Sequence, residues 1–451
     1  MDNNITIDID FPNQNVSTIV KRLLQAGLEA ANPTLAVKKV LSVEGSTLRV
    51  GEKEYGLNTF DRIMCVGAGK ASGEMALALE HILGSRISGG YIAIKDIPEY
   101  RPKNIQLFDT SHPIPNTRSV QASKQILSLA QSLTQRDLLF VLISGGASSL
   151  IAAPASGLSL NDKKLTTSLL LRCGATIQDI NTVRKHLSAI KGGQLAASTS
   201  ATIITLVLSD VLGDDLTTIG SGPTMPDPTT FQDAKEVLRQ FHLLDHVPVA
   251  VKYHLEKGIH RHIPETPKIQ DANGSRVHHQ LIGNNQLSVE GIVKQAEIEG
   301  IHSMVVTNTL EGEAREVGKI FVAIAKKIQA SAHPIPRPAC LVWGGEPTVT
   351  VKGTGRGGRA QELVLSAAIQ IAGLKKSYVA GFGTDGSDGP TDVAGAIVDG
   401  RTVKRAKKLH LDPQEVLSKN DSYKFFKKVG GHIHTGTTGT NVNDVYIHLA
   451  L

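Results

Sequence analysis

Short, almost uninterrupted runs of Val, Ile and Leu recur along the chain, and each is followed by glycine or aspartate and then by an amphipathic stretch. The runs are RIMCVGAGK (62–70), DLLFVLISGG (137–146), ATIITLVLSDV (201–211), CLVWGGE (340–346) and YVAGFGTDG (378–386). Strands that are covered on both faces have such continuous apolar runs, whereas half-exposed strands alternate. Helical patterns lie between the runs, for example at 71–83 and 117–133. The alternation predicts an α/β fold with a doubly wound, mostly parallel sheet.

Two breaks in this pattern divide the chain. At 451 residues it exceeds one ordinary core, because domains usually hold about 100–200 residues. The segment 221–234 contains three prolines and 252–277 is polar with no core pattern, whereas an alternating strand and a helix at 286–299 reopen the second half. We therefore expect an N-terminal Rossmann-like α/β domain at 1–240 and a second α/β domain at 241–451.

Net charge, cysteine content and the lack of long apolar runs limit the kinds of molecule that the protein is expected to bind. The net charge is +6, but the chain lacks the dense basic run interleaved with aromatic residues that is typical of nucleic-acid binding. Anionic small molecules explain a mild basic excess equally well. The three cysteines, Cys65, Cys173 and Cys340, are odd in number and widely spaced, which disfavours a disulfide framework and a zinc site. With no signal pattern at the N-terminus and no apolar run of about 18 residues, we expect a cytoplasmic protein without a membrane partner.

The first candidate loop, GAGKAS at 67–72, resembles neither of the common phosphate-binding motifs. It is not a Walker A loop, because Met64 stands where that loop needs its first glycine and Ala71 follows the lysine. Nor is it a dinucleotide fingerprint, since Ser72 replaces the third glycine. A helix N-terminus with a lysine beside it suits an anion as well as it suits a tight turn with a solvated lysine. The candidate residues are Gly67, Gly69 and Lys70.

A second loop, SGGASS, again follows a strand. Gly145 and Gly146 let a phosphate or carboxylate approach the main chain, and the hydroxyls of Ser144 and Ser148 can donate hydrogen bonds to it. A strained strand-to-helix turn with capping serines is the alternative.

The segment NTVRKHLSAIKGG (181–193) is predicted to be a helix that Asn181 caps and the glycine pair ends. Arg184, Ser188 and Lys191 would then share one face at i, i+4 and i+7. Because like charges on one face repel each other, a bound anion would help to explain them. A solvated face explains them equally well.

Asp210 lies at the tip of a very apolar strand. Acids at that position commonly face the ligand crevice of an α/β sheet and act as a base or bind a metal. Asp214 and Asp215 follow and add negative charge, with helix capping as their alternative role.

The loop GTGRGGRAQE (353–362) is the strongest anion cradle that the sequence predicts. Four of its first six residues are glycine, two arginines lie among them, and an apolar helix follows. Arginine forms planar, bidentate contacts with phosphate oxygens. The candidate residues are Gly355, Gly357, Gly358 and Arg359.

Two further polar loops lie in the C-terminal half. GTDGSDGPTD (383–392) follows a strand and offers Asp385 and Asp388, whose oxygens suit a hard cation such as magnesium. TGTNVND (438–444) is rich in hydroxyls and amides and contributes Asn441. The histidines, His112 among them, lack metal-ligand spacing and are interpreted as ordinary polar residues.

Anion cradles, basic residues and aspartates at strand ends together are what phosphoryl transfer requires. The reaction needs positioning, neutralisation of phosphate oxygens and a base for the attacking hydroxyl. Since these groups come from both halves, we expect the active site in the cleft between the domains. No Gly-x-Ser-x-Gly elbow supports a hydrolase.

The whole set of motifs, in order, resembles the class II glycerate kinases. The motifs are VGAGKAS (66–72), SHPIPN (111–116), LISGGASSL (142–150), NTVRKHLSAIKGG (181–193), LSDVLGDD (208–215), SGPTMPDPTT (221–230), GGEPTVTV (344–351), GRGGRAQE (355–362), GTDGSDGPTD (383–392) and TGTNVND (438–444). The family's critical lysine, aspartate and arginine match Lys70, Asp210 and Arg359. Three positions depart from the family pattern, with Leu212 and Thr437 in place of proline and Ala360 in place of asparagine. The last change puts a polar contact beside the predicted cradle in doubt.

The resemblance implies ATP-dependent phosphorylation of D-glycerate at its 2-hydroxyl, with magnesium. Lys70 and Arg359 would neutralise the substrate carboxylate and the transferring phosphate. Asp210 would orient or deprotonate the hydroxyl, while Asp385 and Asp388 would hold magnesium. An NAD(P)-dependent hydroxypyruvate reductase is the alternative enzyme, and a nucleic-acid-binding or regulatory protein is the non-catalytic alternative. The sequence leaves monomer and homodimer open.

Overall fold

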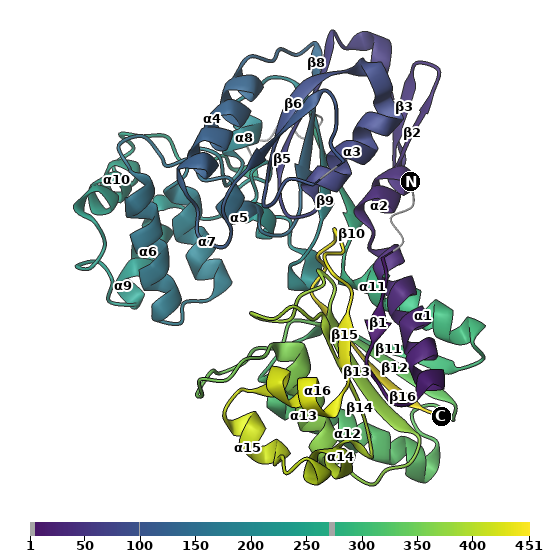
Figure 1. Cartoon of the computed structure of the whole chain (residues 1–451). Coiled ribbons are helices and arrows are strands. Elements are labelled where there is room, and N and C mark those ends of the chain that lie inside the picture. Colours follow the sequence, from purple (N-terminus) through teal and green to yellow (C-terminus); the bar gives the residue numbers. More distant parts are fainter. Residues whose placement is uncertain (1–4, 99, 270–275) are drawn as a thin grey trace. The chain divides into compact units, whose positions relative to one another are not determined.

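The computed structural model describes residues 5–98, 100–269 and 276–451. The chain forms two compact units (Figure 1), one made of Pro33–Ile282 and the other of Met1–Asn32 together with Gly283–Leu451. These bounds differ from the expected division at residue 240, because the N-terminal segment packs with the C-terminal half. The polar stretch at 252–277 begins inside a helix, and its residues 270–275 lie outside the described part. The expected location of the active site, a cleft between the domains, stays a prediction.

A six-stranded sheet is the centre of the first unit, in the order β10-β9-β8-β5-β6-β7. Its strands are β5 (Arg62–Ala68), β6 (Ile87–Ile94), β7 (Ile105–Asp109), β8 (Asp137–Ile143), β9 (Thr202–Leu208) and β10 (Val277–Gly283). The pairings β9–β8, β8–β5, β5–β6 and β6–β7 are all parallel. The prediction of a doubly wound parallel sheet is therefore confirmed, and the strand order reverses between β5 and β8, where ligands bind in this fold.

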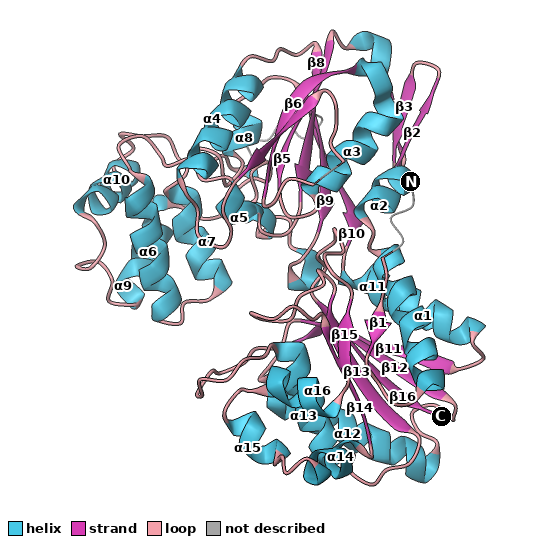
Figure 2. Ribbon diagram, in the orientation of Figure 1, coloured by secondary structure: helices cyan, strands magenta, loops and turns pink. Residues whose placement is uncertain are grey.

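Helices cover both faces of this sheet (Figure 2), with α3 and α4 on opposite faces. The helices of the unit are α2 (Pro33–Val40), α3 (Ser72–Leu83), α4 (Thr117–Gln131), α5 (Ala147–Leu150), α6 (Leu160–Arg172), α7 (Ile177–His186), α8 (Gln194–Ala197), α9 (Phe231–Gln240) and α10 (Val249–Ile259), with 3-10 turns η1 (Leu57–Thr59), η2 (Gly84–Arg86), η3 (Leu212–Asp214) and η4 (Ile219–Ser221). Three short antiparallel strands form a separate small sheet: β2 (Leu41–Glu44), β3 (Thr47–Val50) and β4 (Lys53–Gly56).

Helices α6, α7, α9 and α10 share an apolar core of their own, apart from the sheet. It includes Leu170 of α6, Val183 of α7, Leu238 of α9 and Leu255 of α10, all buried. This helical cluster supports α7, which carries several of the predicted site residues.

The second unit is built on a seven-stranded sheet in the order β1-β15-β14-β13-β16-β12-β11, in which only β11 and β12 pair in parallel. The strands are β1 (Asp8–Ile9), β11 (His302–Leu310), β12 (Ala339–Gly345), β13 (Ser377–Gly383), β14 (Gly395–Asp399), β15 (His432–His434) and β16 (Asp444–Ala450). The helices are α1 (Gln14–Ala30), α11 (Asn285–Ile298), α12 (Ala314–Ser331), α13 (Arg359–Gln370), α14 (Thr402–Lys408), α15 (Pro413–Ser418) and α16 (Ser422–Val429). The expected second α/β domain is confirmed, and its sheet is mixed.

Successive side chains of β12 point to opposite faces of the sheet, and both faces are buried, which explains why the sequence of β12 is continuously apolar. Leu341 and Trp343 face a core shared with α12, α13 and α16, and the Trp343 ring stacks on Phe321 at 4.1 Å between centroids. Cys340 and Val342 face the opposite core, which includes α1 and α11. Both faces of the strand are therefore covered by helices. Within the described ranges, no helix is long and apolar enough to cross a bilayer.

The contact between α1 and α11 explains the domain bounds and is open to test. A β-carbon on Gly291 would lie 2.7 Å from the Ala30 β-carbon and 2.8 Å from the Ala26 carbonyl oxygen. Alanine normally stabilises a helix interior relative to glycine, but here the added methyl group would push the two helices apart. We expect Gly291→Ala to lower the free energy of unfolding by about 1–3 kcal/mol, measured by chemical denaturation. Lys294→Ala, an exposed change on the same helix, is the control and should change stability little; a more stable Gly291→Ala variant would contradict this account of the contact.

Candidate active site

The carboxyl ends of three neighbouring strands bring the predicted loops of the first unit to one edge of the sheet. Ala68 of β5 pairs with Ile143 of β8, and Ile143 pairs with Val207 of β9. The residues that follow, including Lys70 after β5 and Asp210 after β9, therefore lie along the same edge. The expectation that these residues occupy strand ends is confirmed.

The first two loops are bonded to each other. The Lys70 amide donates to the Gly145 carbonyl at 2.8 Å, and the Ala71 amide donates to Ser144 Oγ at 3.0 Å. A β-carbon on Gly69, at φ 144°, would overlap Ser144. Ser144 and Gly69 therefore join the two loops, and Gly67 has a similar role because a β-carbon there would overlap the Leu142 carbonyl.

Gly146 lies between the side chains of Lys70 and His112. A β-carbon on Gly146 would lie 3.0 Å from His112 Cδ2 and 3.6 Å from Lys70 Cγ. His112 belongs to the loop after β7, so the structure brings a third loop to this edge. Its interpretation as an ordinary polar residue missed this proximity; the only sequence signal was its place within the motif SHPIPN.

A chain of polar side chains connects α5, η4 and α7. Ser148 Oγ lies 2.8 Å from Ser221 Oγ, which donates to Asn181 Oδ1 at 3.0 Å. Ser221 has φ 61° between Gly220 at 61° and Gly222 at 57°, an unusual run of left-handed residues. Asn181 is 3% exposed and its Nδ2 group has no hydrogen-bond partner within the described ranges.

The predicted helix at 181–193 is placed differently in the structure. Helix α7 begins earlier, where Thr176 caps it in a capping box with Asp179, and it ends at His186. Asn181 is therefore inside the helix rather than its cap, and Lys191 lies in the loop beyond it. The prediction was wrong because the Thr-x-x-Asp signal upstream was overlooked.

Three cations nevertheless gather near this loop: Lys163 of α6, Arg184 of α7 and Lys191. Lys191 is 2% exposed and its Nζ donates to the Gly220 carbonyl at 3.4 Å; Lys163 is 8% exposed and donates to the Ala153 carbonyl at 3.3 Å. Burial, together with the charge of Arg184, lowers the pKa of Lys163 to about 7. Burial and the other two cations hold the pKa of Lys191 well below its ordinary range.

Lys163 is a residue that the sequence interpretation missed. It lies in register with the buried Thr166 and Leu170 at i+3 and i+7, so it occupies the buried stripe of α6. A lysine on such a stripe was the available signal.

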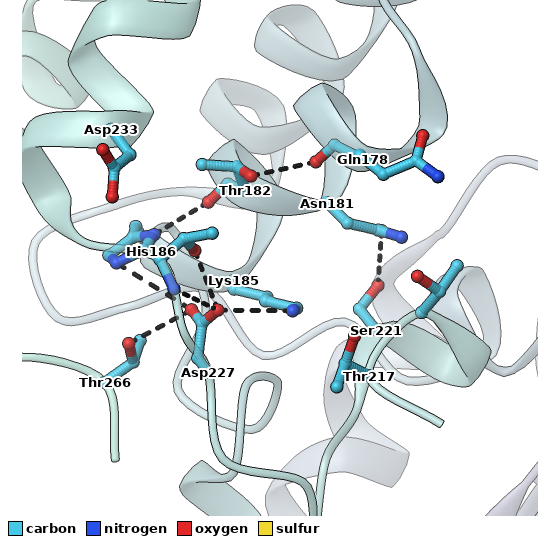
Figure 3. Close-up of polar contacts among 12 residues, drawn as sticks. Gln178, Asn181, Thr182, Lys185, His186, Thr217, Ser221, Asp227, Asp233 and Thr266 are labelled. Carbon is cyan, nitrogen blue, oxygen red and sulfur yellow. Dashed lines mark hydrogen bonds and ion pairs between the residues drawn. The ribbon is translucent and has the colours of Figure 1, made fainter. Parts of the chain in front are cut away.

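The last two residues of α7, Lys185 and His186, are held by buried polar contacts (Figure 3). Lys185 Nζ lies 3.3 Å from Asp227 Oδ1, and Asp227 Oδ2 accepts from Thr266 Oγ1 at 3.1 Å. His186 Nδ1 lies 2.8 Å from the Thr182 carbonyl, and its Nε2 lies 2.9 Å from Glu265 Oε1. These contacts fix the rotation of α7 and hence the direction of Arg184.

In the second unit, Arg359 is the first residue of α13 and is bonded to two carboxylates. Its Nε and Nη2 donate to Asp444 at 2.5 and 3.1 Å, and its Nη1 donates to Glu346 at 2.6 Å. Burial raises the pKa of Asp444 to about 7, although Arg359 acts in the opposite direction. Glu346 was not among the predicted site residues, and Asp444 entered only as part of its loop.

The predicted cradle at the start of α13 is filled by a carboxylate of the protein itself. Asp388 accepts from the amides of Ala360 at 2.9 Å and Gln361 at 2.8 Å, and it is 2% exposed. This geometry favours a capping role for Asp388 over the expected role as a metal ligand. Ala360 is buried in the apolar core, so this departure from the family pattern replaces a polar side chain with a core side chain.

The glycines of the same loop pack against other loops of the unit. A β-carbon on Gly355 would lie 2.5 Å from the Asp421 β-carbon, one on Gly357 would overlap Ser422, and one on Gly358 would overlap Asp388. The close approach of these other loops is enough to require glycine at the three positions, and the expected anion site there stays a prediction.

Asp385 and Asn441 lie on two loops that share contacts. Asp385 is half-buried and its Oδ1 accepts from the Ser387 amide at 3.0 Å. A β-carbon on Gly383 would lie 3.6 Å from that oxygen and 3.5 Å from Asp444 Oδ1, so the two carboxylates flank one position. Asn441 precedes Val442, whose amide donates to Thr384 Oγ1 at 2.9 Å. Throughout the described residues, no cluster of three or more metal-ligating side chains occurs.

Comparison with known proteins gives full-length matches. Residues 19–256 match the family described as a domain of unknown function (DUF4147), and residues 339–444 match the MOFRL family. The glycerate 2-kinase of Pyrococcus horikoshii is 42% identical over 96% of this chain and 97% of its own. The D-glycerate 2-kinase of Thermotoga maritima is 39% identical over 97% and 99%. A protein of Agrobacterium vitis named a putative hydroxypyruvate reductase is 36% identical over 95% and 93%.

A crystal structure of glycerate kinase from Thermotoga maritima superposes with a TM-score of 0.86 at 38% identity, covering 97% of this chain and 100% of that one. A parallel, doubly wound unit with polar loops at its strand ends, joined to a mixed-sheet unit, defines a two-unit α/β enzyme. The chain belongs to the glycerate kinase family.

The network behind α7 predicts a specific pH dependence of stability. Although burial opposes it, hydrogen bonds from His186 and from the Phe231 and Thr266 amides lower the pKa of Glu265 from 4.5 to about 2. A carboxyl with a lowered pKa stabilises the fold above its unfolded value and loses this contribution as pH falls through its folded value. We expect Glu265→Gln to cost about 1–2 kcal/mol at pH 7, after allowance for its partial exposure, and the difference from wild type to shrink as pH falls from about 4.5 toward 2.

The measurement is chemical denaturation of both proteins at a series of pH values. Glu236→Gln, which removes an exposed pair with Arg239, is the matched control and should show a much smaller pH-dependent difference, because solvent screens that pair. A Glu265→Gln effect that stays constant across this pH range would refute the assignment.

Proposed function

We propose that this protein transfers the γ-phosphoryl group of ATP to the 2-hydroxyl of D-glycerate, giving 2-phosphoglycerate and ADP. The observation that carries the proposal is full-length similarity to proteins named glycerate 2-kinase. The cations of the first unit support it, because Lys163, Arg184 and Lys191 form no ion pair with a carboxylate in the described ranges and so fit an anionic ligand such as a phosphate.

In the proposed reaction the 2-hydroxyl oxygen bonds to the γ-phosphorus, and the bond from that phosphorus to the β,γ-bridging oxygen breaks. Asp210 would orient the hydroxyl and accept its proton, because it is a half-buried carboxylate at a strand end. Lys70 and Arg359 would neutralise the substrate carboxylate and the transferring phosphate. Ser148, Arg184, Lys191 and Asn441 would contribute to substrate binding.

The residues around Gly383 fit a magnesium ion, because Asp385 and Asp444 flank the same position with carboxylate oxygens. Magnesium in phosphotransferases typically takes one or two carboxylates together with phosphate oxygens, whose charge it reduces. We propose Asp385 as its ligand, with Asp444 as the neighbouring carboxylate in place of Asp388, whose oxygens accept from the start of α13.

Reduction of hydroxypyruvate with a nicotinamide cofactor is the second candidate, because the Agrobacterium vitis relative has that name. The first loop does not favour it. Ser72 stands at the third glycine of the dinucleotide motif, and its buried hydroxyl bonds to the Leu142 carbonyl at 3.2 Å and lies 3.0 Å from Ser144 Oγ.

A paired assay tests the two candidates. We expect the protein to form ADP when incubated with D-glycerate, ATP and magnesium, and phosphorus NMR should identify the product as 2-phosphoglycerate. In a parallel incubation with hydroxypyruvate and NADH or NADPH, the rate of cofactor oxidation should not exceed that of a protein-free control. Cofactor oxidation without ADP formation would favour the reductase, and neither activity would leave both candidates without support.

Replacement of Arg359 tests its proposed role. We expect Arg359→Ala to lower kcat by at least about 100-fold, the range seen when one donor to a developing charge is removed. Arg401→Ala, a change at an exposed arginine of the same unit, should leave kcat within a few-fold of wild type. Circular dichroism and a thermal melt establish that each variant is folded; near-normal turnover by folded Arg359→Ala would remove this residue from the mechanism.

A further inference from the structure

Two neighbouring cations of α7, Arg184 and Lys185, differ in whether a carboxylate of the protein neutralises them. Lys185 has its carboxylate, Asp227, at 3.3 Å on one face of the helix (Figure 3). Arg184, one residue earlier, is half-buried and has no ion pair or hydrogen bond among the described residues. Within the described part of the chain, α7 therefore pairs one cation with a carboxylate and leaves the adjacent cation without one.

Arg184 is joined there by two lysines that increase the local positive charge. Among the described residues, Lys163 and Lys191 each have a single backbone carbonyl as acceptor, at 3.3 and 3.4 Å, although an ammonium group can donate three hydrogen bonds. The carbonyls of Ala153 and Gly220 thus leave most of this donor capacity unused. Three basic groups so close together, two of them almost fully buried, hold their protons weakly, and a bound oxyanion would favour their charged forms.

A neutral donor completes the cluster. Asn181 lies one turn before Arg184 on α7, and its buried Nδ2 group has no partner in the part of the chain that the structure describes. Its Oδ1 accepts from Ser221 Oγ at 3.0 Å, and this bond fixes the orientation of the amide. Ser221 in turn has the left-handed φ of 61°, and residues held in such conformations cluster at functional sites.

We propose that Lys163, Arg184, Lys191 and the Asn181 amide bind one oxyanion of a substrate, either a carboxylate or a phosphate group, and that Lys163 is a substrate-binding residue of this enzyme. The proposal rests on the proposed function for the identity of the substrate but not for the existence of the site. Lys163 belongs to none of the motifs that carry the family resemblance, and the fold of α6 alone brings it to the cluster.

The test compares Lys163→Met with the matched control Lys164→Met, which changes the next, exposed residue of α6. Methionine keeps the unbranched apolar stem and removes the charge. We expect Lys163→Met to raise the KM for either D-glycerate or ATP by about 10- to 100-fold, the loss for a hydrogen bond to a charged group. Its melting temperature should equal or exceed that of wild type, because a repelled, desolvated charge has been removed; a lysine with only a structural role would lower it.

Titration calorimetry with inorganic phosphate gives a readout that does not depend on turnover. Phosphate should bind wild type and Lys164→Met alike and bind Lys163→Met at least about 10-fold more weakly. Asn181→Asp, an isosteric change that supplies an internal carboxylate next to Arg184, should fold stably and lose phosphate binding. A rise in the KM for D-glycerate alone assigns the cluster to the carboxylate, and a rise for ATP alone assigns it to the phosphates.

The proposal and the proposed function fail separately. If wild type forms no ADP but binds phosphate in a Lys163-dependent way, the oxyanion site stands and the kinase assignment falls. If wild type is an active glycerate kinase and folded Lys163→Met retains both KM values and phosphate affinity, the oxyanion site is overturned.

Discussion

Strands β5 and β8 approach each other so closely at their carboxyl ends that a side chain larger than hydrogen does not fit at Gly67 or Gly69. This contact brings the loops after both strands into one hydrogen-bonded structure, in which Ser144 accepts from Ala71. The loops lie at the point where the strand order of the sheet reverses, and helices α3 and α5 both begin there. Lys70 lies beside Gly146 and His112 because of that contact. All three residues lie in loops, so no helix or strand of their own determines where they are placed.

The two units differ in how they neutralise the cations of their candidate sites. Arg359 in the second unit is bonded to Asp444 and Glu346, so its charge is balanced within the protein. Arg184 and Lys191 in the first unit have no such partner in the described ranges, and burial lowers the pKa of both. An anion that enters the first unit meets basic groups that no carboxylate of the described residues neutralises, whereas an anion that approaches Arg359 must compete with two carboxylates. The cations of the first unit are therefore the better-prepared binding groups.

Much of the fold follows from local sequence patterns. The continuous apolar runs predicted β5, β8, β9, β12 and β13 because each is covered on both faces. The packing of the N-terminal helix α1 with the C-terminal half of the chain could not be predicted from such patterns. It depends on a close contact between Gly27 and Ile292, about 265 residues apart, and hydrophobic periodicity contains no information about which distant helix will pack against which.

The positions of the candidate site residues could be predicted where a motif follows directly after a strand. They could not be predicted where a side chain from a distant part of the chain bonds to the motif. Lys70 and Asp210 follow their strands as expected. The glycines before Arg359 illustrate the limit, since a glycine-rich loop is equally suited to a ligand and to another segment of the same chain. Asp388, some 30 residues later, fills the helix N-terminus that the sequence left open. A helix N-terminus signals an anion site only when no acid of the protein can reach it, and Asp388 is bonded to this one through two backbone amides. At α7 no acid of the described residues reaches Arg184, because the nearby carboxylate of Asp227 is bonded to Lys185 and Thr266 instead.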